Sequence, residues 1–268
     1  MHSHSRRALA IPVTFLILLV SMLGVISITY YFAIERVNAE SQVLKVSMAK
    51  QAMNSLDEAM LSVLWQPGSS RTMEFGDFGG QLDVQPLSNW LVVNITDNNG
   101  ISDTVFNSSI GQAAYELPYS ESADTGLYLK GDSGVLVNQS GSPVTQLCII
   151  NGAEHPEILL HYRLVVSSTI SGTEDNQTIN DLRIYVVNLN ASQNIEFMGE
   201  VPLRISCSGV ETMLKTYNVT YQSTALTVVA SLGGAQGQVA IPISSDTNGA
   251  IINVELVVCN ATIERWVR

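Results

Sequence analysis

Cysteine is scarce in this chain of 268 residues. Its three cysteines, Cys148, Cys207 and Cys259, include no C-x-x-C pair, so the spacing of a zinc ribbon or a thioredoxin-like redox motif is missing. An odd number also leaves at least one thiol without a partner inside the chain. The sequence therefore excludes a small fold that depends on a dense set of disulfides.

Positive charge is scarce as well. Lys and Arg number 13 against 24 Asp and Glu, the net charge is −11, and the one basic cluster is Arg6-Arg7. Binding to a phosphate backbone requires clustered cations that release counterions. We therefore expect no nucleic-acid partner, and the acidic composition is typical of a well-solvated domain.

A histidine base for serine chemistry is missing from the expected place. The run Gly131-Asp132-Ser133-Gly134 matches the nucleophile motif of chymotrypsin-like serine proteases. That mechanism needs a histidine upstream in the same domain, and the upstream histidines, His2 and His4, precede a long apolar segment. The sequence favours a tight turn before a strand over 135–137.

Metal-binding motifs are also incomplete. His155, Glu157 and His161 are close in sequence, but on a strand that starts at Ile158 only positions 157 and 161 share a face. No third ligand group and no H-E-x-x-H helix accompanies them. We expect no metal, no cofactor and no enzymatic activity; an anchored hydrolase would require a constellation that the sequence does not reveal.

A long apolar run is present from Ala8 to Ile34, without a charged residue. As a helix it would span roughly 40 Å, more than the ~30 Å hydrocarbon core of a bilayer. Tyr30, Tyr31 and Phe32 would lie in an outer aromatic belt. We predict a transmembrane helix over residues 8–34 with the lipid bilayer as its partner. The alternative, a buried helix of a soluble protein, is disfavoured by this length.

The flanks of this run predict its orientation. Arg6 and Arg7 should keep residues 1–7 in the cytoplasm as a basic leader, which places the rest of the chain outside the cell membrane. A cleaved secretory signal is the alternative, since Val37-Asn38-Ala39 has small residues at a suitable spacing. Such signals have an apolar region of only about 7–15 residues, so we favour a retained single-pass anchor.

Residues 35–66 carry the pattern of an amphipathic stalk helix. Its polar face is predicted to hold Lys45, Lys50, Gln51, Asn54, Asp57 and Glu58. The apolar stripe recurs every three or four residues and consists of Val46, Ala49, Met53, Leu56, Met60 and Val63. The stripe could pack on the chain's own domain or against neighbouring subunits, and the period does not distinguish these alternatives.

Beyond residue 70 the hydrophobic period becomes two. Strands are predicted over 91–95, 135–137, 158–166, 182–189, 201–207, 217–221, 226–232, 239–243 and 251–258. Short strands separated by turn residues favour an antiparallel β-sandwich in a head over residues 67–268. A weak break near residues 168–180 could divide the head into two smaller sandwiches. The expected fold is therefore mainly β after the N-terminal helices.

The strand phases also predict how two cysteines are arranged. Cys207 alternates in phase with Val201, Leu203 and Ile205, whereas Cys259 is out of phase with the apolar positions 252–258. A disulfide needs Cα atoms within about 7 Å and converging side chains. We therefore expect no bridge between Cys207 and Cys259.

Glycosylation signals are numerous. Chance would leave roughly three Asn-x-Ser/Thr triplets in a chain with 18 Asn. Seven occur, all in the region predicted to lie outside, at Asn94, Asn107, Asn138, Asn176, Asn190, Asn218 and Asn260.

The sequence Arg6 to Val13, followed by an apolar helix, an amphipathic helix and a β-rich head, resembles archaeal type IV pilins and pilin-like envelope proteins. The resemblance implies that a prepilin peptidase cuts between Arg7 and Ala8. It also implies that apolar helices of several subunits bundle while glycosylated heads face solvent. We expect a non-enzymatic, single-pass cell-surface protein with a role in a pilin-like envelope structure or in adhesion. The alternative is a monomeric, membrane-anchored ligand-binding or sensory ectodomain.

Overall fold

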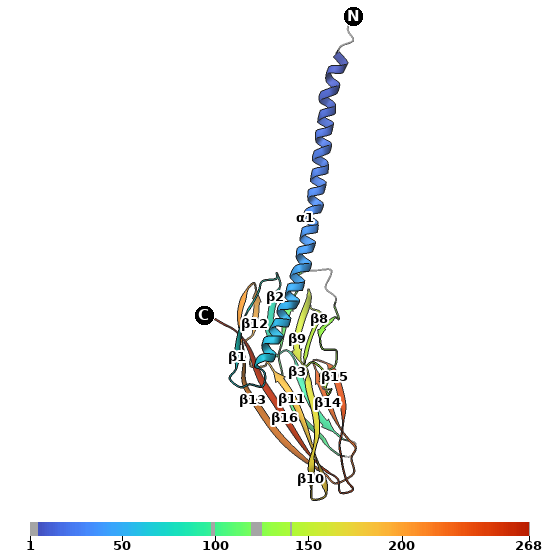
Figure 1. Ribbon diagram of the computed structural model, residues 1–268, viewed down its shortest axis with the longest axis vertical. Helices are drawn as coiled ribbons and strands as arrows, with labels where there is room; N and C mark the ends of the chain where they lie inside the picture. The colour runs from blue at the N-terminus through green and yellow to red at the C-terminus, as the bar shows by residue number, and fades with distance from the viewer. Residues whose placement is uncertain (1–4, 98–99, 119–124, 140, 268) are drawn as a thin grey trace. The chain divides into compact units, whose positions relative to one another are not determined.

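The computed structural model describes residues 5–97, 100–118, 125–139 and 141–267, with side chains from Val13 onward. These residues form one α-helix and sixteen β-strands (Figure 1). The expectation of a mainly β protein with one long apolar helix at its N-terminus is confirmed. The chain divides into two compact units, one ending at Lys45 and the other running from Val46 to Arg268.

The helix α1 (Ser5–Val63) continues unbroken from the first unit into the second. Every side chain from Val13 to Lys45 is exposed. The helix is long and apolar enough to cross a membrane by length and composition. Three hydroxyl groups of the apolar stretch donate to backbone carbonyls about one turn earlier, Ser21 to Leu18 at 2.9 Å and Ser27 and Thr29 to Leu23 and Val25 at 2.8 Å, so these three do not require water.

Three β-sheets make up the rest of the second unit. Sheet A has the strand order β1 (Ser70–Phe75), β13 (Val201–Val219), β16 (Ala250–Arg265), β11 (Gln177–Asn188), β10 (Leu164–Glu174) and β7 (Leu136–Val137). Sheet B has the order β12 (Ile195–Met198), β2 (Gln81–Gln85), β5 (Gln112–Glu116), β9 (Pro156–Tyr162), β8 (Thr145–Asn151) and β6 (Tyr128–Lys130). Sheet C has the order β15 (Ala235–Pro242), β14 (Ala225–Leu232), β3 (Trp90–Thr96) and β4 (Ser102–Ser109).

The expectation of purely antiparallel pairing is wrong for two pairs in sheet A. The last strand, β16, lies between β13 and β11, antiparallel to the first and parallel to the second. The short strand β7 is parallel to β10. A two-residue period places side chains on faces but does not choose the neighbouring strand, so β16 could enter the middle of the sheet without leaving a local signal.

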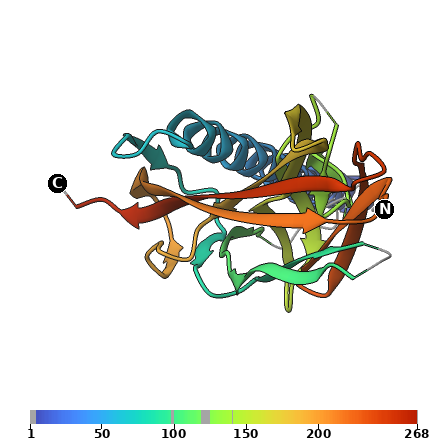
Figure 2. The same ribbon diagram turned by 90° about the horizontal axis from the view of Figure 1, so that it is seen from below.

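Two hydrophobic clusters form on opposite faces of sheet A. Cluster 1 contains apolar residues of α1 from Val46 to Val63 together with Leu64, inward residues of sheet B, and the segments 201–207 and 259–263 of sheet A. Cluster 2 joins inward residues of sheet C to Leu182, Ile184 and Val186 of β11 and to Ile252, Val254, Leu256 and Val258 of β16. Figure 2 shows β13 and β16 with α1 on one side and the green strands of sheet C on the other. The change from one cluster to the other takes place along the length of β11 and β16. Residues 168–180, where the sequence showed a weak break, form the β10–β11 hairpin.

This two-faced burial corrects the predicted separation of two cysteines. Residues 252–258 of β16 bury their apolar set in cluster 2, but Cys259 points to the other face and enters cluster 1. Cys207 enters cluster 1 as well, and the two Sγ atoms lie 3.6 Å apart. The predicted strand phases of Cys207 and Cys259 were right. The assumption that only one face of the sheet is buried was wrong.

Three methionines of α1 provide a matched test of this packing. Met53 and Met60 have no exposed surface, whereas Met48 is 44% exposed. In the full chain in detergent, Met53→Lys and Met60→Lys should each lower the free energy of unfolding by roughly 3–5 kcal/mol, because each buries an uncompensated ammonium. Met48→Lys should change it by less than about 0.5 kcal/mol. Denaturant melts of all three variants measure this, and equal effects would contradict the packing of α1.

Candidate functional site

The predicted apolar stripe of α1 lies inside the chain's own β-rich unit. Its residues, Val46, Ala49, Met53, Leu56, Met60 and Val63, are all buried in cluster 1. Sheet B and the 201–207 and 259–263 segments of sheet A supply most of the other members of the cluster. Of the two alternatives left open by the sequence, the structure therefore has the stripe packed on its own domain.

A buried carboxylate, Asp57, lies within this stripe. Its side chain has no exposed surface and forms an ion pair with Lys130 of β6, whose side chain is 29% exposed. Asp57 Oδ1 accepts hydrogen bonds from Thr145 Oγ1 of β8 at 2.7 Å and from Tyr162 Oη of β9 at 3.1 Å. Three neighbouring strands of sheet B thus provide the partners that a buried charge needs.

The polar face predicted for α1 was therefore wrong at one position. Lys45, Gln51 and Glu58 are exposed and Lys50 and Asn54 are half-buried, but Asp57 is buried. The spacing in the sequence indicated that Asp57 would be buried, because position 57 follows Met53 by four residues and precedes Met60 by three. Burial, and next the charge and hydrogen bond of Asp57, raise the pKa of Tyr162 well above its ordinary value, so this phenol remains a donor.

The residues that follow the C-terminal end of α1 are bonded to the adjacent strands β13 and β16 of sheet A. The Trp65 amide, in a residue with a positive φ of 65°, donates to Cys259 Sγ of β16 at 3.3 Å. The Gly68 amide donates to the Cys207 carbonyl at 2.9 Å, and the Cys207 amide donates to the Ser69 carbonyl at 3.0 Å. We call this arrangement, together with the bonds of Asp57, the helix–head junction. It fixes the C-terminal part of α1 and the residues that follow it.

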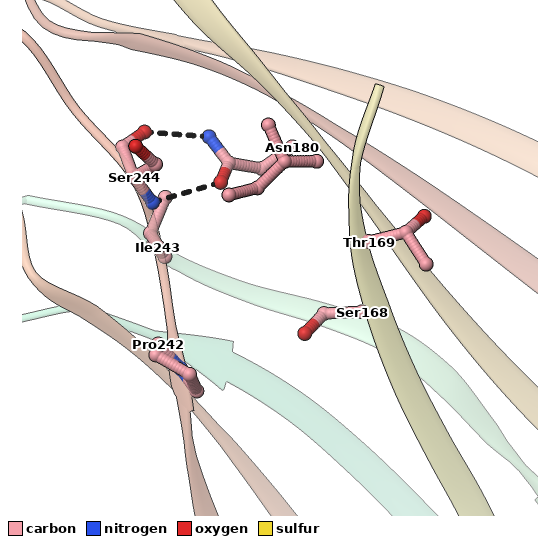
Figure 3. A pocket seen from close by; sticks show the side chains of 7 residues that line it. Ser168, Thr169, Asn180, Pro242, Ile243 and Ser244 are labelled. Carbon is pink, nitrogen blue, oxygen red and sulfur yellow. Dashed lines mark hydrogen bonds between the residues drawn. The ribbon is translucent and has the colours of Figure 1, made fainter. Parts of the chain in front are cut away.

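A groove lies beside β10 of sheet A, beyond the two residues of β10 that pair with the short edge strand β7. Ser168, Thr169 and Ile170 of β10 line it together with residues of the segment that follows β15. Its volume is about 490 Å³. On its floor, the Asn180 amide group donates to the Ser244 carbonyl at 2.8 Å and accepts from the Ser244 amide at 2.9 Å (Figure 3). The lining is uncharged and mixes hydroxyl, amide and apolar groups.

The protease-like run forms a turn bound to a buried arginine. Gly131 has a φ of 79°, and the Gly134 amide donates to Asp132 Oδ1 at 2.8 Å. Arg163, which is 2% exposed, donates to the same oxygen at 2.6 Å. The Gly134 hydrogen bond, and then Arg163, lower the pKa of Asp132 below its ordinary value. Arg163 was missed from the sequence because nothing in a strand pattern shows that its guanidinium would have a carboxylate partner.

The two downstream histidines, His155 and His161, have different interaction partners. His155 Nε2 is 3.7 Å from Glu116 Oε1, whereas His161 contacts Gln146 through Nε2. Burial, and then the charge of Arg163, lower the pKa of His161 to about 4, which keeps its imidazole neutral at physiological pH. Within the residues that the structure describes, no group of three metal-ligating side chains is found.

The seven predicted glycosylation acceptors differ in exposure. Asn94, Asn190 and Asn260 are half-buried, and the Asn260 amide nitrogen already donates to Glu211 Oε1 at 2.8 Å. The exposed acceptors are Asn107, Asn138, Asn176 and Asn218. The predicted leader cleavage point, Arg7 and Ala8, lies in the first turns of α1.

Comparison of the chain with protein-family models, with curated proteins and with solved structures finds no match. The interpretation of the site therefore depends on its own geometry.

Asp57 and its neighbour Glu58 test the helix–head junction. Asp57→Ala in the full chain in detergent should lower the free energy of unfolding by about 3–5 kcal/mol, because Lys130, Thr145 and Tyr162 lose a shared acceptor. Glu58→Ala should cost less than about 0.5 kcal/mol, since Glu58 is exposed. Denaturant unfolding measures both effects. A small effect of Asp57→Ala would contradict the stabilising role that we assign to Asp57 in the junction.

Proposed function

We propose that this chain is a non-enzymatic, single-pass cell-surface protein that acts as a pilin-like envelope or adhesion component. In this proposal residues 8–34 cross the cell membrane, residues 1–7 remain in the cytoplasm, and the β-rich head is displayed outside. The head is a β-sandwich in which sheets A and C share cluster 2.

One observation carries the proposal: apolar side chains of α1 are exposed over several turns. From Val13 to Ile34 they contact no buried core of the chain, and Phe15 is 70% exposed. Transfer of such side chains from water to an apolar medium is favourable by ~1.5–3 kcal/mol for each large residue. Lipid, or the matching helices of other subunits, supplies that medium.

The continuity of α1 into the helix–head junction supports a direct connection between anchor and head. No separate linker is needed, because one helix contains both the exposed apolar stretch and the buried stripe. A pilin-like subunit requires such a connection, since its head must follow the position of its helix in an assembly.

Contacts between subunits would use residues outside the buried stripe. Val37, Val43 and Leu44 are exposed apolar residues that follow the predicted membrane segment, and Met48 is 44% exposed. We propose that they form the helix contacts of an assembly, together with the exposed residues of the apolar stretch.

A monomeric, anchored ligand-binding or sensory ectodomain is the second candidate. The groove beside Asn180 and Ser244 favours it, because its mixed lining could hold a neutral, hydrogen-bonding ligand. Isothermal titration with neutral sugars and short peptides would test this groove.

The topology leads to a prediction for intact cells. Protease added from outside should remove the head and leave a membrane-held fragment that contains residues 8–34, because only the head would be accessible. Immunoblots with tags at each end measure this, and permeabilised cells provide the control. Full protection of the head in intact cells would contradict the proposed orientation.

Assembly leads to a second prediction, with a matched pair on α1. Leu44→Glu should abolish surface filaments or oligomers, because it places a carboxylate in an apolar helix contact. Gln42→Glu adds the same charge about 200° around the helix and should leave assembly intact. Electron microscopy of cells and size-exclusion chromatography in detergent measure assembly. A Leu44→Glu protein that assembles like wild type would contradict the helix contact proposed at Leu44, whereas a wild-type protein that forms no filaments or oligomers would favour the monomeric candidate.

A further inference from the structure

Two thiols meet in cluster 1 beneath the end of α1. Cys207 of β13 and Cys259 of β16 are 1% and 0% exposed, and their Sγ atoms are 3.6 Å apart. Both are free thiols in the structure. The third cysteine, Cys148, lies on β8 of sheet B.

The pairing of the two strands explains why these side chains converge. Cys207 lies opposite Ala261, and a β-bulge at Ser208 then shifts the register so that Val210 lies opposite Cys259. Cys207 and Cys259 are therefore diagonal neighbours on one face of an antiparallel pair, an arrangement in which side chains can touch. A bulge increases the local twist of the strands and redirects side chains.

We propose that Cys207 and Cys259 become an intramolecular disulfide in the mature protein. The inference rests on the proposed function in one respect, because an extracytoplasmic head would fold in an oxidising environment. Formation of a normal disulfide requires the sulfurs to approach from contact distance to about 2.05 Å.

The oxidant is the disulfide of an extracytoplasmic thiol–disulfide oxidoreductase. One cysteine, as its thiolate, attacks a sulfur of that disulfide, forms a mixed disulfide and releases one thiolate of the oxidoreductase. The second cysteine then attacks the mixed disulfide and displaces the other sulfur. The two cysteines lose two protons and two electrons in total, and the oxidoreductase gains them as two thiols.

The exchange must take place before α1 closes over sheet A. Both sulfurs are buried in the folded chain, and the Trp65 amide bonds to Cys259 Sγ. Burial is the main cause that raises the pKa of Cys259 to about 12, so its reactive thiolate is disfavoured once the head has folded. After folding, the same burial would protect the disulfide from reductants.

Thiol labelling of the full chain tests the inference. Protein extracted from cells into detergent is denatured and treated with a maleimide polymer, with and without prior reduction. Wild type should add one tag without reduction, at Cys148, and three after it. Cys148→Ser should add none and then two, whereas Cys207→Ser and Cys259→Ser should each add two in both conditions.

A thermal measurement gives a second readout. Reduction during unfolding should lower the Tm of wild type by on the order of 10 °C, because the bridge closes a long loop between residues 52 positions apart. Cys259→Ser should show no such shift. An unchanged Tm of wild type on reduction would overturn the proposal.

Three tags on unreduced wild type would also overturn the proposal. The protease experiment on intact cells then shows which assumption failed. If the head is cleaved, the location is right and the disulfide is wrong. If the head is protected, the proposed location is wrong as well.

Discussion

The burial of the Asp57 carboxylate is the constraint on which the arrangement of helix and sheets depends. A charge inside cluster 1 is stable only when its partners are in place. Those partners, Lys130, Thr145 and Tyr162, come from three strands of sheet B. Only one rotation and one height of α1 bring the carboxylate to all three. Apolar packing alone would tolerate several positions of the stripe, so the polar contacts add specificity to the hydrophobic energy.

Sheet A connects this junction to the rest of the β-rich unit. Its long strand β16 buries one face in cluster 1 and the opposite face in cluster 2, while β13 contributes residues 201–207 to cluster 1 and Val219, at its far end, to cluster 2. The two cores therefore share the same backbone hydrogen bonds. A change that loosens β16 in one cluster would loosen it in the other, which couples the helix–head junction to the strands of sheet C.

Local patterns predicted the long helix and most of the longer strands, but they did not predict β1, β2, β4, β5, β6, β8 and β12, nor which elements meet. The uncharged stretch 8–34 was long enough to identify a helix, and the alternation of 201–207 placed Cys207 on a buried face. The parallel pairing of β11 with β16 left no local trace, because phase is independent of strand direction. Asp57 was assigned to the polar face by residue type although its spacing placed it in the stripe. The Arg163–Asp132 pair joins two segments whose proximity exists only in the fold.

The unbroken helix has a mechanical consequence. Tension applied to α1 would reach the buried segment between Val46 and Val63 through a continuous helix. There it would be resisted by the Asp57 contacts and by the bonds of Trp65 and Gly68 to β16 and β13. Force would be shared among several bonds that must break together. Such shear loading resists rupture better than the successive opening of single bonds.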